Sequence, residues 1–253
     1  MRRRPPLILA YHGVGKVPLR DDPHGLFVRP RELRRQIATL RRWGYELLTC
    51  GAMAEHVAAG EGAGHAALTF DDGFADNLHE LLPILQEVRA PATVFAVSGW
   101  LGRPHPVAPF QRLLTGAELA ELHAAGVEIG GHTATHPDLT ALGPEAAREE
   151  LARGRRELEE LIGAPVTVVA YPFGRATAET RHCARAAGFT AAVRTSAQGS
   201  WSDPFDLPRQ DIENAGTRLG FRLKRDDRYE PLMRTRPGRV ARRVLRRARE
   251  VVR

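Results

Sequence analysis

Short apolar runs alternate along the chain with longer segments in which apolar residues recur at helical spacing. The short runs are typical of buried strands and occur at residues 7–11, 46–48, 67–70, 92–97, 127–131, 166–170 and 189–194. The longer segments predict helices over residues 30–43, 51–59, 74–89, 115–125, 144–162 and 177–187. Strands that alternate with helices pair in parallel, and about seven such units predict an α/β fold that forms a closed or nearly closed (β/α) barrel.

Polar residues stand directly after four of the predicted strands. In a (β/α) barrel the carboxyl ends of the strands share one rim, and the working residues lie there. We therefore expect one functional site at these positions, which are His12, Asp71 with Asp72, His132 with His136, and Tyr171 with Pro172.

The strand over residues 67–70 ends in two adjacent carboxylates, Asp71 and Asp72, followed by Gly73. Two acids held together raise each other's pKa, so the pair needs solvent or a cation beside it. A metal ion is one interpretation. The alternative is that Asp72 caps a helix that begins near Phe74.

His132 and His136 are four residues apart, a spacing that lets two imidazoles reach one metal ion. Two surface histidines at this spacing are also common without a metal. With Asp72 as a third ligand, the set has two imidazoles and one carboxylate, which suits zinc or a neighbouring divalent ion and leaves positions open for water and substrate. Asp71 is then a candidate general base.

Length and composition indicate a globular α/β domain, since 253 residues suit a barrel, and two small domains are the alternative that this length allows. No apolar run approaches the roughly 20 residues that span a membrane. The charged N-terminus imitates a signal peptide, but its apolar stretch is short and runs into Tyr11 and His12 without a small-residue cleavage site. We therefore expect a cytoplasmic protein. Cys50 and Cys183 have no metal-ligand spacing and indicate ordinary thiols.

The net charge of +7 belongs to the C-terminal end of the chain. Residues 234–253 hold nine arginines and one acid, a net charge of +8, which leaves −1 for residues 1–233. We expect a folded domain over residues 1–233, whose charge argues against a nucleic-acid-binding core, and a basic tail over residues 234–253. Apolar residues of the tail share one helical face, which suits an anionic membrane surface such as the inner face of the cell membrane. Nucleic-acid binding by the tail and a merely solvated tail are the alternatives.

Three motifs carry a resemblance to a known family. Thr69-Phe70-Asp71-Asp72-Gly73, His132-Thr133-Ala134-Thr135-His136 and Tyr171-Pro172-Phe173-Gly174, in this order, resemble the leading motifs of the polysaccharide deacetylases with a NodB-homology domain. The similarity covers roughly residues 5–215. It implies a distorted (β/α) barrel that hydrolyses the N-acetyl group of an amino sugar in a glycan.

The resemblance also implies a role for each motif residue. Asp72, His132 and His136 correspond to the metal ligands, and Asp71 corresponds to the general base. The third motif, Tyr171-Pro172-Phe173, corresponds to the segment whose backbone N–H at Phe173 holds the oxyanion. Thr133 is expected to support the ligands through a hydrogen bond. Zinc is the metal that the resemblance and the ligand set favour, with acidification of a bound water as its contribution.

The sequence departs from the family pattern at the partner of the base. Many members have an arginine two residues before the proline of the third motif, whereas this chain has Ala170. Arg209 could supply the guanidinium instead. The alternative is that Arg209 pairs only with Asp206 or Asp211 at the surface.

A second departure concerns the general acid, because no histidine follows His182. A subgroup that resembles the poly-N-acetylglucosamine deacetylases uses a histidine from a Tyr-His pair at the end of the first strand. Tyr11 and His12 match this pair, so His12 is expected to protonate the leaving amine. A structural hydrogen bond at the rim is the alternative for His12.

Residues 100–109 are predicted to form a long loop of the kind that shapes a binding site. Trp100 in this loop could stack on a sugar ring or pack in the core. No chemistry is assigned to the histidines outside the rim positions, His24 and His105 among them.

The predicted activity is therefore metal-dependent removal of N-acetyl groups from amino sugars, in a glycan or in a lipid-linked glycan precursor at the membrane. Two alternatives use the same fold. One is the same chemistry on a formyl or cyclic amide, and the other is an inactive carbohydrate-binding relative. The presence of both acids and both histidines argues against the inactive relative.

Overall fold

The structure, a computed structural model, describes residues 4–18, 20–195, 199–212 and 218–225, together with Leu232 and Thr235. The basic tail predicted over residues 234–253 lies outside the described residues, apart from Thr235. In the described part of the chain, no helix is both long enough and apolar enough to cross a membrane.

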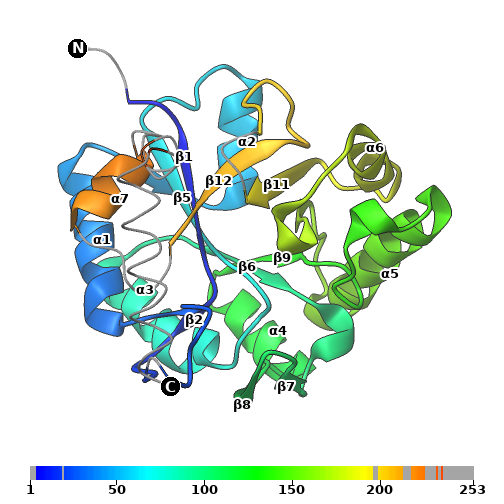
Figure 1. Cartoon of the computed structure of the whole chain (residues 1–253), viewed down its shortest axis with the longest axis horizontal. Helices are drawn as coiled ribbons and strands as arrows, with labels where there is room; N and C mark the ends of the chain where they lie inside the picture. Colours follow the sequence, from blue (N-terminus) through cyan, green and yellow to red (C-terminus); the bar gives the residue numbers. More distant parts are fainter. Residues whose placement is uncertain are drawn as a thin grey trace.

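Seven parallel strands close into a barrel, as the alternating pattern predicts, with helices around it (Figure 1). The two ends of the strand order meet where β1 pairs with β5, with Tyr11 opposite Phe70. An eighth strand, β4 (Glu46–Leu48), pairs in parallel with the first residues of β5, with Glu46 opposite His65. Around the barrel the strands follow the order β1 (Leu7–Tyr11), β12 (Leu207–Asp211), β11 (Ala191–Thr195), β10 (Val168–Ala170), β9 (Glu128–Gly131), β6 (Thr93–Ala96) and β5 (His65–Phe70).

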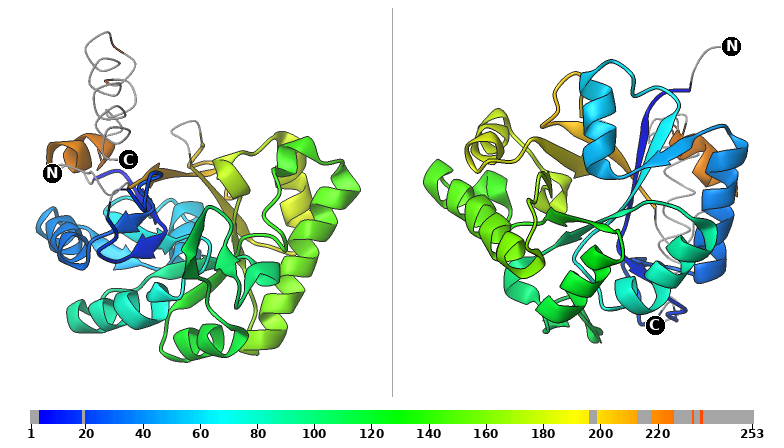
Figure 2. Two further views of the ribbon diagram at one scale, coloured as in Figure 1. Left: turned by 60° about the horizontal axis from the view of Figure 1, so that its bottom comes forward. Right: turned by 180° about the vertical axis from the view of Figure 1, so that it is seen from behind.

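Six of the described α-helices lie close to the predicted positions. They are α1 (Pro30–Arg42), α2 (Cys50–Ala58), α3 (Leu82–Val88), α4 (Gly116–Ala124), α5 (Pro144–Ile162) and α6 (Ala178–Ala186). The pattern does not predict α7 (Arg218–Arg225). Figure 2 shows the helices on the outside of the sheet from two further sides. The helix predicted over residues 74–89 is divided into a π-helical turn, η1 (Asn77–Leu81), and α3, which has Pro83 in its first turn. Pro83 has no N–H to donate within a helix, and it lies where the π-helical turn changes to the α-helix.

Two features differ from the prediction. Strand β12 has no long apolar run, because Pro208 and Arg209 interrupt it, and the pattern does not predict it. The predicted loop over residues 100–109 is instead a 3₁₀ turn, η2 (Ser98–Trp100), followed by an antiparallel hairpin of β7 (Pro104–His105) and β8 (Ala108–Arg112). Two smaller strands, β2 (Gly13–Val14) and β3 (Phe27–Val28), pair beside the rim.

Alternate residues of the strands build two apolar layers. Leu7, Leu9 and Tyr11 of β1 pack with the surrounding helices, whereas Ile8 joins residues from five other strands in a separate cluster. Since strand side chains alternate between faces, this second cluster fills the barrel interior. Its members from the strands are Ile8, Ala67, Phe95, Val168, Ala170, Ala191, Val193 and Leu207. The same alternation directs Asp71 and Arg209 inward, above Ala67 and Leu207.

Candidate active site

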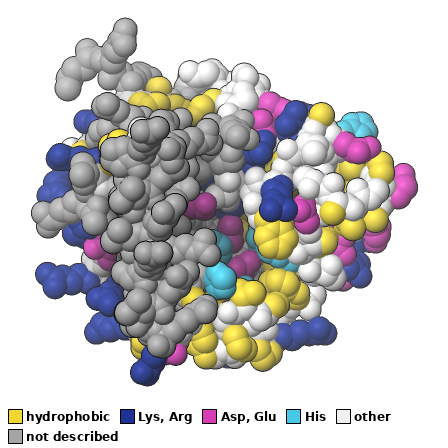
Figure 3. All heavy atoms as spheres, viewed as in Figure 1, with side chains coloured by type: hydrophobic (Ala, Val, Ile, Leu, Met, Phe, Trp, Pro, Cys, Tyr) yellow, Lys and Arg dark blue, Asp and Glu magenta, His cyan; other side chains and the backbone are white. Residues whose placement is uncertain are grey.

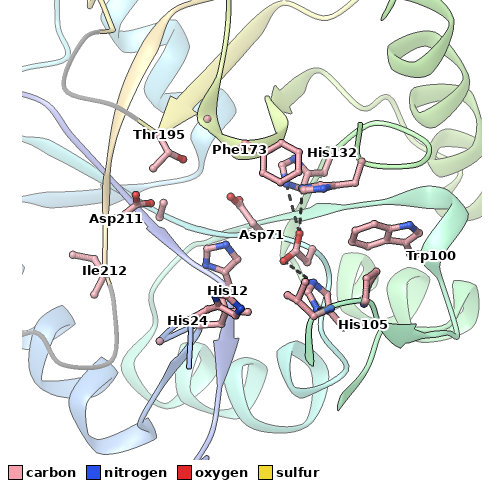
Figure 4. Close-up of a pocket in the computed structure, with 18 residues that line it drawn as sticks. His12, His24, Asp71, Trp100, His105, His132, Phe173, Thr195, Asp211 and Ile212 are labelled. Atoms are coloured by element: carbon pink, nitrogen blue, oxygen red, sulfur yellow. Dashed lines mark hydrogen bonds and ion pairs between the residues drawn. The ribbon is translucent and has the colours of Figure 1, made fainter. Parts of the chain in front are cut away.

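The register of β1 against β5 brings His12 and Asp71 to the same point of the rim. Tyr11 and Phe70 are paired, and the backbone N–H of Asp71 donates to the carbonyl oxygen of Tyr11 at 2.9 Å. Both residues line a cavity of about 620 Å³, shown in Figure 4. Figure 3 shows its mouth as a hollow in which histidine and acidic side chains lie among hydrophobic ones.

Asp72, His132 and His136 converge in this cavity from two different strand ends. One ligand atom of each lies within 4.8 Å of the others, and they form the only such three-residue group found in the described part of the chain. Oδ1 of Asp72 is 3.6 Å from Nε2 of His132 and 3.8 Å from Nε2 of His136. Three converging donors, two nitrogens and one oxygen, fit a zinc-type ion and leave a coordination position open.

The tautomer of His132 agrees with a ligand role. Its Nδ1 lies 2.7 Å from the carbonyl oxygen of Ala170, so Nδ1 carries the proton and Nε2 offers its lone pair toward Asp72. Burial and the neighbouring imidazole of His132 lower the pKa of His136 to about 4, which keeps this second ring neutral near pH 7. Burial raises the pKa of Asp72, but the hydrogen bond from His105 and the surrounding histidines outweigh it, and the net pKa lies below the ordinary value.

Helix α5 supports the segment that carries both histidines. A Cβ on Gly154 would lie 2.6 Å from the carbonyl carbon of Thr133, so only glycine lets the helix approach this closely. The backbone N–H of Ala134 donates to the carbonyl oxygen of Glu150 (3.1 Å), and the Glu150 carboxylate accepts from Thr135 N–H (2.8 Å). The predicted supporting residue, Thr133, is buried on this segment.

Thr133 holds the second ligand directly, because its Oγ1 accepts a hydrogen bond from the backbone N–H of His136 at 2.9 Å. Four residues of the site adopt left-handed backbone angles that non-glycine residues rarely use. They are Asp72 (φ 70°), Thr133 (66°), His136 (58°) and Phe173 (57°). Backbone strain of this kind persists only where the surrounding structure imposes it, and it concentrates at functional sites.

Asp71 is held by a buried, two-point salt bridge with Arg209. The guanidinium Nη1 and Nη2 donate to Oδ1 and Oδ2, both at 2.7 Å, and also donate to the hydroxyls of Thr69 (3.0 Å) and Thr195 (3.2 Å). Burial raises the pKa of Asp71, but the charge of Arg209 outweighs this, so the net pKa lies below its ordinary value. Arg209 is 1% exposed and occupies the barrel interior. It supplies the guanidinium beside Asp71 that Ala170, at the position where many family members have an arginine, does not.

His12 lines the cavity on the side of β1. Its carbonyl oxygen accepts a hydrogen bond from the side-chain amide of Asn77 (3.3 Å), and Oδ1 of Asp76 accepts from the backbone N–H of Val14 (2.8 Å). These two side chains of the segment after the acid pair therefore position the backbone that carries His12. In Figure 4 its ring lies next to His24, and Asp211 lies farther along the same wall.

The third motif contributes Phe173 to the cavity, whereas Tyr171 and Pro172 are buried behind it. The Tyr171 hydroxyl donates to the carbonyl oxygen of Phe205 (3.0 Å), a contact that anchors the turn. Phe173 has 60% of its surface exposed, and its ring centroid is 4.8 Å from that of His136. Among the three predicted residues, Phe173 alone is placed to face a substrate.

The sequence analysis missed His105, which is buried in the cavity wall with Nε2 3.2 Å from Oδ2 of Asp72. The available signal was a histidine between two prolines, Pro104 and Pro106, in a segment expected to shape a binding site. Trp100 also lines the cavity, with its ring centroid 5.0 Å from that of His136.

The chain is therefore a parallel (β/α) barrel with a candidate metal-binding site of two histidines and one aspartate at its rim. Residues 59–192 match the family model described as polysaccharide deacetylase. Because the match covers more than half of the chain, the chain belongs to the polysaccharide deacetylase family.

The chain is also similar to two curated proteins that are named as deacetylases. The chain is 26% identical over 190 residues to the putative polysaccharide deacetylase YxkH of Bacillus subtilis, covering 74% of this chain and 63% of the relative. It is 30% identical over 152 residues to a chitooligosaccharide deacetylase of Sinorhizobium fredii, covering 58% and 64%. The chain thus spans less than two thirds of the length of these relatives.

Solved structures share the fold at low sequence identity. The Streptococcus pyogenes deacetylase PplD, in complex with acetate, aligns with a TM-score of 0.76 at 22% identity, covering 88% of this chain and 99% of that one. IcaB from Ammonifex degensii aligns with a TM-score of 0.72 at 22% identity, covering 88% and 96%.

Proposed function

We propose that this chain is a metal-dependent hydrolase that removes N-acetyl groups from amino-sugar residues of a glycan. One observation carries the proposal. An ionised carboxylate, Asp71, is fixed by Arg209 beside the converging ligand atoms of Asp72, His132 and His136 in a single cavity. A general base beside a candidate metal site can activate water for hydrolysis of an amide.

Asp72, His132 and His136 would hold the metal, with zinc as the ion that the donor set favours. Bound there, the ion would supply Lewis-acid polarisation of the acetamide carbonyl and a lowered pKa for water. Both imidazoles are suited to this role because His132 offers an unprotonated Nε2 and His136 is neutral near pH 7.

Asp71 would act as the general base. Its lowered pKa keeps it ionised at neutral pH, and the two-point contact with Arg209 fixes the direction of its oxygens. It would take a proton from the attacking water as the water oxygen bonds to the carbonyl carbon. The backbone N–H of Phe173, in a strained turn at the cavity, would hold the resulting oxyanion.

His12 would act as the general acid. It lines the cavity together with Asp71, and imidazole is the side chain most often used for general acid–base catalysis. Its proton would pass to the amide nitrogen as the C–N bond breaks, releasing acetate and the free amine. Asn77 and Asp76 would position it through the backbone contacts described above.

Membership of the family and the name of the chitooligosaccharide deacetylase support an acetylated amino sugar as the substrate. Exposed apolar surface at Phe173 and Val107, with Trp100 deeper in the wall, offers faces on which sugar rings can pack. The same chemistry on a formyl or cyclic amide is the competing activity, and a carbohydrate-binding relative without turnover is the competing class.

The test is acid release from N-acetylglucosamine oligomers by the zinc-loaded protein, with acetate and formate identified separately. Asp71→Asn should abolish release and retain zinc, while Asp21→Asn, at an exposed position outside the cavity, should behave as the wild type. Formate from a formylated analogue with no acetate from the oligomers would favour the competing activity. Glycan binding without turnover would contradict the proposal.

The basic tail gives the proposal a second part, that a cytoplasmic enzyme acts beside the inner membrane on a lipid-linked amino sugar. The support is the charge of +8 and the amphipathic pattern of residues 234–253. Removal of these residues should reduce sedimentation with anionic vesicles and leave turnover of soluble oligomers unchanged. Unchanged sedimentation would contradict this part alone.

A further inference from the structure

His105 occupies a buried position in the first strand of the β7–β8 hairpin, with 4% of its surface exposed. Its ring centroid lies 4.6 Å from that of Phe74 and 5.6 Å from that of Trp100, which meets it edge-on. These aromatic contacts hold the plane of the ring. Figure 4 shows the histidine in the cavity wall, with a dashed line to the carboxylate that it contacts.

The two ring nitrogens of His105 have different partners. Nδ1 accepts hydrogen bonds from the backbone N–H groups of Val107 (3.3 Å) and Ala108 (3.2 Å), so it carries no proton of its own. The ring proton therefore sits on Nε2, which lies 3.2 Å from Oδ2 of Asp72. The hairpin backbone thus selects the tautomer that donates to Asp72.

The two oxygens of Asp72 consequently have separate roles. Oδ2 accepts the hydrogen bond from His105, whereas Oδ1 faces the Nε2 atoms of His132 and His136 at 3.6 and 3.8 Å. A buried carboxylate with one oxygen occupied in this way has only the other available to an ion. The hydrogen bond to Oδ2 also restricts rotation of the carboxylate.

We propose that His105 is a positioning residue that presents a single oxygen of Asp72 to the metal ion. The inference rests on the proposed function, because it takes Asp72, His132 and His136 as the ligands. One carboxylate oxygen with two imidazole nitrogens is a donor set for zinc, whereas calcium would use more oxygens and often both of one carboxylate. Hydrogen-bond partners of metal ligands orient those ligands and tune affinity.

The hairpin that selects the tautomer also borders the cavity mouth. Val107, one of the two N–H donors to His105, is 56% exposed and lines the cavity. A single element therefore faces the substrate side and fixes the carboxylate ligand, and a shift of the hairpin would change the hydrogen bond to Asp72.

Three substitutions separate the two sides of the ring. His105→Gln places an amide N–H near the position of Nε2 and keeps the donor to Asp72. His105→Asn offers an oxygen near the position of Nδ1 for the hairpin N–H groups, but cannot reach Asp72. His105→Leu removes both functions, and His79→Leu, at an exposed histidine outside the cavity, controls for the loss of a histidine.

The measurements are zinc affinity of the full chain, by competition with a chromogenic chelator, and the visible absorption spectrum of the cobalt(II) form. Circular dichroism and thermal unfolding of each metal-free variant show whether it is folded. We expect zinc affinity to fall roughly 10- to 100-fold in the Leu and Asn variants, with an altered cobalt spectrum, and to be largely retained in the Gln and His79 variants.

Two results would overturn the inference. If His105→Asn binds zinc as the wild type does while His105→Gln is impaired, the residue supports only the hairpin. If all three variants match the wild type in affinity and spectrum, Asp72 needs no partner. A wild-type chain that binds neither zinc nor cobalt would overturn the proposed function as well, and this outcome is distinguishable because it is independent of His105.

Discussion

Replacing Arg209 by methionine tests whether the buried salt bridge holds Asp71 in its ionised state. Methionine has similar bulk and no charge, so the substitution leaves the Asp71 carboxylate, 4% exposed, without its cation. The hydroxyls of Thr69 and Thr195 lose the same donor. Removing one partner of a buried ion pair costs about 3–5 kcal/mol of unfolding free energy, because an uncompensated charge remains in the interior.

This cost should depend on pH with a definite sign. In the wild type the pKa of Asp71 lies below its ordinary value, so its contribution to stability is present at neutral pH and is lost as the pH falls through the folded-state pKa. Without Arg209, burial, the largest cause, raises the pKa of Asp71 and is opposed only by the smaller effects of His132 and His12. The variant can then relieve the buried charge by taking up a proton, so the stability difference should be largest near neutral pH and shrink in mild acid.

Urea and thermal unfolding measure the effect. A loss of about 3–5 kcal/mol corresponds to a fall in melting temperature of roughly 6–20 °C for a chain of this size. The double variant with Asp71→Asn should recover most of the loss, since no buried charge is left unpaired. Arg175→Met provides the control, because Arg175 is 65% exposed and its surface pair with Asp138 should contribute no more than about 1 kcal/mol.

The prediction is wrong if Arg209→Met costs less than about 1 kcal/mol, or if Asp71→Asn fails to restore stability in the double variant. Either result would mean that Asp71 is neutral in the wild type or is solvated through the cavity. A general base held by Arg209 would then have no structural basis.

Three further predictions concern the support of the site. Gly154→Ala should lower the free energy of unfolding by about 1–3 kcal/mol and weaken zinc binding, because its Cβ would collide with the backbone of Thr133. Gly143→Ala, at the N-cap that precedes the same helix, places its Cβ more than 4 Å from any other atom and should have a small effect in both urea unfolding and zinc titration. Burial lowers the pKa of His136 from 6.5 to about 4. The free energy of unfolding of the metal-free protein should therefore fall by up to about 3 kcal/mol as the pH falls between these values. His136→Gln should remove this pH dependence, as measured by unfolding in the presence of a chelator. Burial raises the pKa of Asp76 to about 7, and its Oδ2 has no hydrogen-bond partner among the described residues. The free energy of unfolding should therefore fall as the pH rises toward this pKa and the buried carboxyl ionises. Asp76→Asn should therefore stabilise the protein more at about pH 8 than at about pH 5 in urea unfolding, and equal effects at both would contradict the assignment.

The amino-acid sequence by itself determined the barrel class and the location of the site. Apolar runs that alternate with amphipathic segments require parallel strands covered by helices, and the residues after each strand must then gather at one rim. The motif residues Asp72, His132 and His136 meet there as predicted from their positions. Local patterns suffice for these features because each depends on the period of a short segment.

Only the tertiary structure decided which distant residues touch. Arg209 reaches Asp71 because β12 lies beside β1 in the closed barrel and both side chains point inward, although 138 positions separate them in the chain. His105 reaches Asp72 because residues expected to form a loop fold into a hairpin that also selects its tautomer. No local period carries either contact, since each depends on strand order and on the packing of segments that are remote in sequence.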